Sequence, residues 1–146
     1  MDYLIMCIGN KEGGDDAIGP YVANKLKKYD DIIVLDCGTV PENYTSIVKK
    51  NKPKNLIIID SVDMNLGPGD IRIVPKEKIG VMHISTHGIP LSVLIGYLEP
   101  YIENIYLIGI QPKTMSGKLT NSVRKSGEKL IEIIKNKKID QIKKLQ

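Results

Sequence analysis

The sequence predicts an α/β fold, a three-layer α/β/α sandwich with a mostly parallel, twisted sheet of about five strands and one antiparallel edge strand. Three observations lead to this prediction. Short apolar runs alternate with amphipathic stretches, as expected for strands joined by helical crossovers. The run Asn55 to Asp60 is apolar between polar ends, which is typical of a central strand covered on both faces. No linker or repeat interrupts the alternation, so residues 1–146 are expected to form a single domain.

The first half of the chain is expected to supply two strands and two helices before this central strand. Tyr3 to Ile8 has the composition of a buried strand, and Ala17 to Tyr29 carries apolar residues on one helical face. Pro20 is compatible with that helix because it falls in the first turn, where its missing N–H would have no intrahelical partner. Ile32 to Asp36 is predicted to be a strand and Glu42 to Lys50 a short helix.

The second half continues the alternation after a turn at residues 66–69. Asp70 to Val74 follows the central strand too closely for a helical crossover, so it is expected to be the antiparallel edge strand. Ile89 to Leu98 is predicted to be a helix, Ile105 to Ile110 the last strand, and Thr120 to about Lys137 the last helix.

Composition narrows the classes of function. Hydrophobic residues make up 42% and charged residues 26% of the chain, which is ordinary for a globular protein. With neither Phe nor Trp, the core must be aliphatic. The net charge of +4 arises mostly near the C-terminus, from Arg124, Lys125, Lys129, Lys135, Lys137, Lys138, Lys143 and Lys144. This spacing suits the solvated face of a helix, and no aromatic residues are interleaved to stack on bases, so no nucleic-acid partner is expected.

The cysteines and the apolar runs bear on the compartment. Cys7 and Cys37 lie in strand-like runs without metal-binding spacing and without a disulfide framework, which favours a reducing cytoplasm. The N-terminus lacks the layout of a signal peptide. No apolar run approaches the roughly 20 residues needed to cross a bilayer, so membrane insertion is not expected.

Candidate site residues gather at one edge of the predicted sheet. Ligands of open α/β sheets bind beyond the carboxyl ends of the strands. Asp15 and Asp16 follow the first strand, Asp60 ends the central strand, and His83 and His87 lie in the loop before the next helix. Two carboxylates and an imidazole form a ligand set that suits a divalent metal such as nickel, zinc or cobalt.

Each candidate also has a purely structural interpretation. One acid of the first pair is expected to cap the first helix, and Asp15 is favoured for this role. Asp60 could brace the turn that follows its strand. His83 lies among apolar residues, where a partly buried histidine is expected, whereas the polar loop around His87 favours an exposed ligand.

Other chemistries fit this sequence less well. Gly9 and the pair Gly13–Gly14 do not form a dinucleotide or P-loop motif, and Glu12 would repel a phosphate there. No GxSxG motif is present, and neither cysteine is flanked by features of an activated nucleophile. A bare carboxylate pair like that of aspartic proteases would favour acid pH, whereas a metal between the carboxylates would suit neutral pH.

Four sequence blocks resemble the hydrogenase maturation endopeptidases and occur in the same order as in that family. The blocks are Gly9–Asn10 with residues 14–20 (GDDAIGP), residues 36–43 (DCGTVPEN), residues 59–69 (IDSVDMNLGPG) and residues 85–91 (STHGIPL). The second and fourth blocks most resemble the type that processes the large subunit of hydrogenase 3. The chain departs from the family at Glu12, where an apolar residue is usual, and by an added glycine. This departure bears on which precursor is accepted.

The resemblance implies a nickel-dependent aspartyl endopeptidase that removes the C-terminal extension of a [NiFe] hydrogenase large-subunit precursor after nickel insertion. Carried over from the family, the catalytic and metal-contacting residues are Asp16, Asp60 and His87. The nickel is expected to arrive with the precursor, and either acid could act as general base. A non-catalytic nickel-binding or chaperone protein on the same fold is the alternative.

Overall fold

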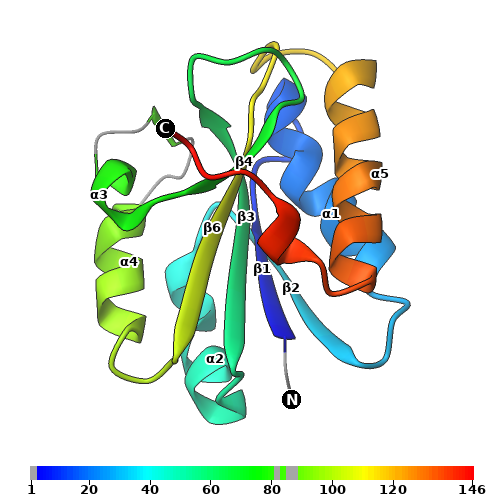
Figure 1. Ribbon diagram of the computed structural model, residues 1–146. Coiled ribbons are helices and arrows are strands. Elements are labelled where there is room, and N and C mark those ends of the chain that lie inside the picture. Colours follow the sequence, from blue (N-terminus) through cyan, green and yellow to red (C-terminus); the bar gives the residue numbers. More distant parts are fainter. Residues whose placement is uncertain (1–2, 81–82, 85–88) are drawn as a thin grey trace.

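The computed structural model describes residues 3–80, 83–84 and 89–146, in which a central sheet is covered by helices on both faces (Figure 1). Five strands form the sheet in the order β2-β1-β3-β6-β4. Their bounds are β1 Tyr3–Ile8, β2 Ile32–Gly38, β3 Asn55–Asp63, β4 Ile71–Val74 and β6 Asn104–Ile110. The first four strands in this order run parallel to one another, and β4 runs antiparallel to β6. The predicted mostly parallel sheet with one antiparallel edge strand is therefore confirmed.

The edge strand pairs with β6 and not with the strand that precedes it in sequence. Both edges of β3 are already occupied, by β1 and by β6. The start of β4 is held beside the end of β6 by two backbone hydrogen bonds, from Gly69 N to Gln111 O (2.8 Å) and from Gln111 N to Asp70 O (2.9 Å). A further strand, β5 (His83–Ile84), pairs antiparallel with the end of β3. Two residues are too few to show periodicity, so the sequence did not predict β5.

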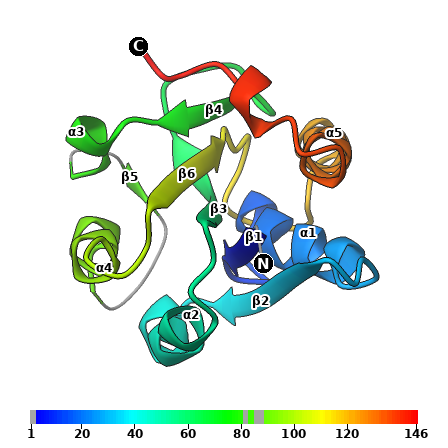
Figure 2. The same cartoon turned by 60° about the horizontal axis from the view of Figure 1, so that its bottom comes forward.

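The helices form the two outer layers, seen with the sheet nearly on end in Figure 2. The α-helices are α1 Ile18–Leu26, α2 Thr45–Asn51, α3 Lys76–Ile79, α4 Leu91–Leu98 and α5 Asn121–Lys135. α1 and α5 cover one face, whereas α2 and α4 cover the other. The three-layer prediction is thus confirmed.

Several helices begin at residues other than those that the sequence predicted. Short 3-10 segments, Gly14–Ala17 and Pro41–Tyr44, precede α1 and α2. α4 begins after Pro90, two residues later than predicted, because proline disfavours helical geometry in the residue before it. α3 has only four residues and was not predicted.

Each face of the sheet has its own aliphatic core, set by the alternation of side chains along the strands. On the α1/α5 face, Ile57 and Ile59 of β3 pack with residues of both helices. On the α2/α4 face, Leu56 and Ile58 of β3 pack with residues of α2 and α4. This alternation places the side chains of consecutive β3 residues in different layers. At the end of the strand it puts Asp60 and Ser61 on opposite faces of the sheet.

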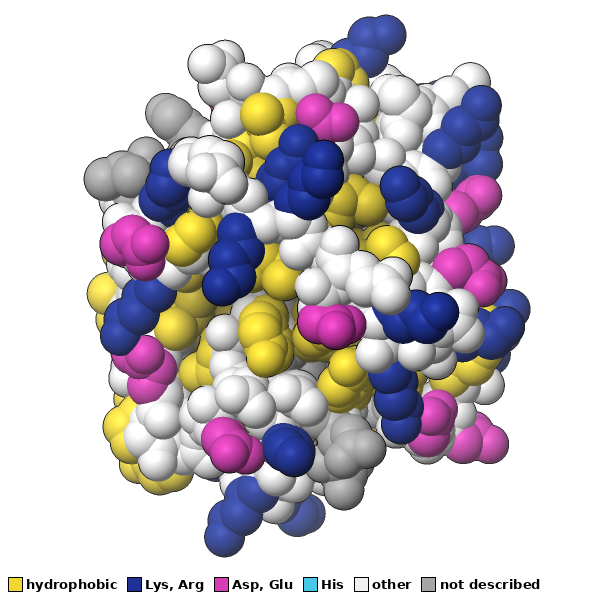
Figure 3. All heavy atoms as spheres, viewed as in Figure 1, with side chains coloured by type: hydrophobic (Ala, Val, Ile, Leu, Met, Phe, Trp, Pro, Cys, Tyr) yellow, Lys and Arg dark blue, Asp and Glu magenta, His cyan; other side chains and the backbone are white. Residues whose placement is uncertain are grey.

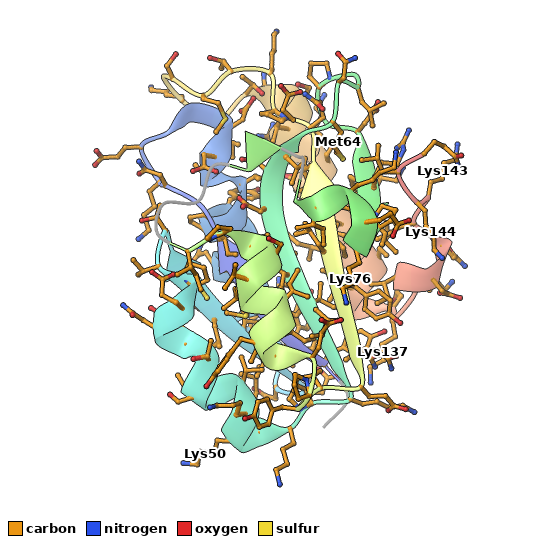
Figure 4. All side chains as sticks on the ribbon, turned by 90° about the vertical axis from the view of Figure 1, so that its left-hand side faces the viewer. Lys50, Met64, Lys76, Lys137, Lys143 and Lys144 are labelled. Atoms are coloured by element: carbon orange, nitrogen blue, oxygen red, sulfur yellow. The ribbon has the colours of Figure 1, made fainter. Side chains whose placement is uncertain are left out.

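The C-terminal tail covers the outer edge of β4. Ile73 N donates to Lys143 O and Leu145 N donates to Ile73 O, both at 2.9 Å. Ile142 packs into the core on the α1/α5 face and Leu145 into the core on the α2/α4 face, while Lys143 and the neighbouring Lys144 project outward (Figure 4). The tail thus blocks an edge that would otherwise be free to pair with another chain.

Charged side chains of both signs are mixed on the surface, as the composition leads one to expect. Lys and Arg side chains are scattered among Asp and Glu over the face shown in Figure 3. Within the described ranges, no helix is long and apolar enough to cross a membrane.

Candidate functional site

The candidate site lies at the carboxyl ends of β1 and β3, where Met64 marks the end of β3 in Figure 4. After β1 the chain turns through residues 9–13 and enters the 3-10 segment that carries Asp16. Asp60 lies near the end of β3, in register with Gly109 of β6. The two acids predicted from the sequence are therefore brought to the same edge, 44 positions apart in the chain but close enough to interact electrostatically.

Both carboxylate oxygens of Asp16 are held by the protein. Oδ1 accepts a hydrogen bond from the Ser61 hydroxyl at 2.7 Å, and Oδ2 accepts one from the Asn10 backbone N–H at 2.8 Å. Asp16 is 3% exposed. Donors to both oxygens hold the orientation of the carboxylate.

Asp60 has the opposite environment. Its side chain is completely buried, and within the described part of the chain neither carboxylate oxygen has a hydrogen-bond partner. Burial raises the pKa of Asp60 well above its ordinary value, and the nearby Asp16 carboxylate raises it further. Because buried carboxylates normally coordinate metals or are paired, this acid fits the role of a cation ligand.

Asp16 and Asp60 reach this point from different layers. The alternation along β3 puts Asp60 on the α2/α4 face and Ser61 on the α1/α5 face. Asp16 precedes α1 and meets Ser61 on the α1/α5 face. The acid pair thus spans the end of the sheet.

Two glycines allow the loop that carries Asp16 to lie against β1. A Cβ on Gly9, which has φ 152°, would clash with the Asp16 carbonyl, and a Cβ on Gly19 would clash with the Ile8 carbonyl. Larger residues at these positions would push the 3-10 segment away from the sheet.

The predicted capping role of Asp15 is wrong. The 3-10 segment and α1 have no side-chain cap. Asp15 instead accepts hydrogen bonds from the backbone N–H groups of Lys113 (2.8 Å), Thr114 (3.2 Å) and Thr120 (2.7 Å), and from the Thr120 hydroxyl. Burial opposes ionisation, but these donors outweigh it and lower the pKa of Asp15. Asp15 therefore anchors the loop between β6 and α5.

The histidines are placed only in part. His87, the third predicted ligand, lies outside the described residues. His83 belongs to β5, where its backbone is in register with Asp63 of β3. Among the described residues, no group of three His, Cys, Asp or Glu side chains could hold a metal, so the described part of the site consists of Asp16 and Asp60.

Sequence reasoning missed two polar residues that shape this edge. Ser61 contacts Asp16 directly, and the signal for it was a hydroxyl beside Asp60 in an otherwise apolar strand. Gln111 binds the backbone N–H groups of Met64 (2.6 Å) and Leu66 (3.2 Å) through Oε1, and Asp63 Oδ1 through Nε2. Gln111 thereby fixes the loop that leaves β3, a role with no local sequence signal.

A hollow of about 420 Å³ adjoins the loop that holds Asp16. It is lined by Asn10, Lys11, Glu12, Asp36 and other residues at the ends of β1 and β2. Asn10 links the hollow to the acid pair, because its backbone N–H binds Asp16. A chain segment bound in this hollow would lie next to the candidate site.

Comparison with known proteins identifies the family of the chain. A family model described as hydrogenase maturation protease matches residues 20–137. The hydrogenase 3 maturation protease of Escherichia coli K12 is 37% identical, over 77% of this chain and 74% of that protein.

Solved structures agree with this match. The solution structure of the endopeptidase HycI from Escherichia coli has a TM-score of 0.90 at 29% identity, covering 100% of this chain and 97% of that one. The crystal structure of a [NiFe] hydrogenase maturation protease HycI from Thermococcus kodakarensis KOD1 has a TM-score of 0.82 at 30% identity, covering 94% and 92%. The resemblance predicted from the four sequence blocks is confirmed, and the chain belongs to the hydrogenase maturation proteases, which are endopeptidases.

Proposed function

We propose that this endopeptidase removes the C-terminal extension of a [NiFe] hydrogenase large-subunit precursor after nickel has been inserted. The observation that carries the proposal is the buried pair of carboxylates, in which Asp16 is held by two donors and Asp60 has no hydrogen-bond partner among the described residues. An arrangement that leaves a buried acid unsatisfied is suited to a cation that arrives with the substrate.

Asp16, Asp60 and His87 would contact the nickel of the precursor. Carboxylate and imidazole ligands suit nickel as well as zinc and cobalt. When bound, the ion would hold the scissile region in place and polarise a carbonyl or a water. A precursor without nickel would lack this attachment, which explains why cleavage would follow metal insertion.

The two acids are suited to different tasks. The Asp16 carboxylate is held in one orientation by Ser61 and Asn10, which suits a fixed ligand. Within the described residues the Asp60 oxygens have no hydrogen-bond partner, so an oxygen of Asp60 that does not contact the metal is the better candidate to accept a proton from an attacking water. Asp60 is therefore assigned as general base in this proposal.

The hollow beside Asn10 would receive the precursor segment near the cleavage point. Lys11 and Glu12 place opposite charges along its rim, so polar residues of the precursor would be selected there. Glu12 is exposed, and its backbone N–H donates to Asn10 Oδ1 at 2.9 Å. We expect Glu12 to influence which precursor is accepted, and a hydrogenase 3 type of large subunit to be the substrate.

The reaction is expected to take place in the cytoplasm. Cys7 and Cys37 are buried free thiols, in keeping with a reducing compartment.

The proposal is tested by the intact mass of a hydrogenase 3 type large-subunit precursor, with and without nickel, after incubation with the protein. We expect loss of a C-terminal peptide only from the nickel-loaded precursor. Asp16→Asn should abolish the cleavage, whereas Asp31→Asn, which changes an exposed acid paired with Lys137, should not. An unchanged mass for a well-folded, nickel-loaded precursor would contradict the proposal and favour a binding role.

A further inference from the structure

We propose that Ser61 is a positioning residue that fixes the Asp16 carboxylate in the orientation needed to bind the metal. This inference rests on the proposed function, because it assumes that Asp16 is a nickel ligand. It assigns a specific task to a residue that lies beside the acid pair without belonging to the ligand set.

The geometry is direct. The Ser61 hydroxyl donates to Asp16 Oδ1 at 2.7 Å, and Ser61 is 1% exposed. The Asn10 backbone N–H holds the other oxygen at 2.8 Å. With a donor on each oxygen, rotation of the carboxylate about its Cβ–Cγ bond is opposed from both sides. Only one of these donors is a side chain, so Ser61 is the one that mutation can remove.

The position of Ser61 in the fold explains why this residue can link the two acids. Ser61 directly follows Asp60 in β3, and the two side chains point into different layers. Asp16 comes from the layer that contains α1 and Asp60 faces the layer that contains α2 and α4. β3 therefore carries Asp60 and, through Ser61, orients Asp16. This arrangement sets the relative position of the two acids.

Packing of the hydrophobic core does not require a serine at position 61. Residues 56–59 and Val62 of β3 are buried and apolar, so an alanine at position 61 would continue the same pattern. A structural role alone would be seen as a change in stability. A positioning role would be seen in metal binding, because loss of a residue that orients a ligand typically weakens metal affinity or activity about 10–100-fold.

The test compares the wild type with Ser61→Ala by calorimetric titration with Ni²⁺ and by the visible spectrum of the Co²⁺-bound protein. We expect Ser61→Ala to bind Ni²⁺ about 10–100-fold more weakly and to change the Co²⁺ ligand-field bands. The control is Ser126→Ala, which removes a hydroxyl bonded at 3.1 Å to the Ser122 carbonyl in α5 and should leave both readouts unchanged.

A second pair of variants separates the hydroxyl from the shape of the side chain. Ser61→Thr and Ser61→Val have nearly the same shape, and only threonine keeps the donor. We expect the threonine variant to bind Ni²⁺ more tightly than the valine variant. Equal affinities for that pair, or wild-type affinity for a folded Ser61→Ala, would overturn the inference.

The two proposals can fail separately. If the wild type cleaves the nickel-loaded precursor and binds Ni²⁺ but Ser61→Ala does both equally well, only the positioning role is lost. If the wild type binds neither Ni²⁺ nor Co²⁺ and also leaves the nickel-loaded precursor intact, the ligand set and the positioning role are both overturned. If the wild type binds the metal but leaves the precursor intact, the proposed nickel-dependent cleavage fails while the orientation of Asp16 stands.

Discussion

Replacing Asp60 with asparagine should stabilise the metal-free protein, although it removes a residue assigned to the reaction. Asp60 is fully buried and, in the described ranges, without a hydrogen-bond partner. Burial, reinforced by the Asp16 carboxylate, raises the pKa of Asp60 in the folded state above the ordinary 3.8. Protonated Asp60 therefore contributes stability that is fully present below about pH 4 and is lost as the pH rises through the folded-state pKa.

The magnitude follows from the environment of the side chain. A buried polar group without a partner costs about 1–3 kcal/mol, and more when charged. Asparagine keeps the polar atoms but removes the charge and its repulsion with Asp16, so we expect a gain of about 1–2 kcal/mol near pH 8. For a protein of this size each kcal/mol shifts Tm by roughly 2–4 °C, which gives an increase of about 2–8 °C.

Thermal unfolding of both proteins in a chelator, between about pH 4 and pH 8, measures this difference. The two Tm values should be similar at the acid end and should separate as the pH rises, with Asp60→Asn the more stable. Asp31→Asn changes an exposed acid and should show no such trend. A variant that is less stable than the wild type at about pH 8, or a difference that does not depend on pH, would refute the reasoning.

Four further predictions concern the stability of the fold. Asp15→Asn should destabilise the protein by about 2–4 kcal/mol near pH 7, because three backbone N–H donors lose a charged acceptor. The lowered pKa of Asp15 means that this loss in a denaturant titration should shrink below about pH 4. Gly19→Ala should prevent folding or lower Tm strongly, because its Cβ meets the Ile8 carbonyl. Gly96→Ala, in open space on α4, should stabilise by up to about 1 kcal/mol, as the same melts would show. Removing residues 142–146 should cost about 3–5 kcal/mol through loss of Ile142 and Leu145, and should promote association through β4, seen by light scattering.

The parts of the fold that the sequence predicted are those set by local pattern. Asn55–Asp63 and the other long strands have apolar runs that can be recognised one at a time. The position of Asp16 and Asp60 at one edge follows from parallel pairing alone, because every parallel strand ends at the same side of the sheet. The acid pair could therefore be predicted without knowledge of any side-chain contact.

The features that could not be predicted depend on partners far away in the chain. Asp15 looks like a helix cap, but its donors at Lys113 and Thr120 are about a hundred residues away. The pairing of β4 with β6, and of the C-terminal tail with Ile73, likewise joins segments that share no local signal. The local sequence shows that Asp15 can accept hydrogen bonds from backbone N–H groups. The tertiary structure determines which N–H groups lie close enough to donate.

Three acids near one edge of the sheet differ in how the protein satisfies them, and the difference separates structure from function. Asp15 accepts bonds from three backbone N–H groups and a hydroxyl, as expected of an acid kept to hold a loop. Asp16 accepts a hydrogen bond on each oxygen, from Ser61 and from Asn10, and so keeps a defined orientation. Asp60 has none among the described residues, and burial raises its pKa. A turn brace alone would not require a buried acid that lacks a partner in the described part of the chain, so the contrast between Asp15 and Asp60 favours a functional role for Asp60 in the proposed site.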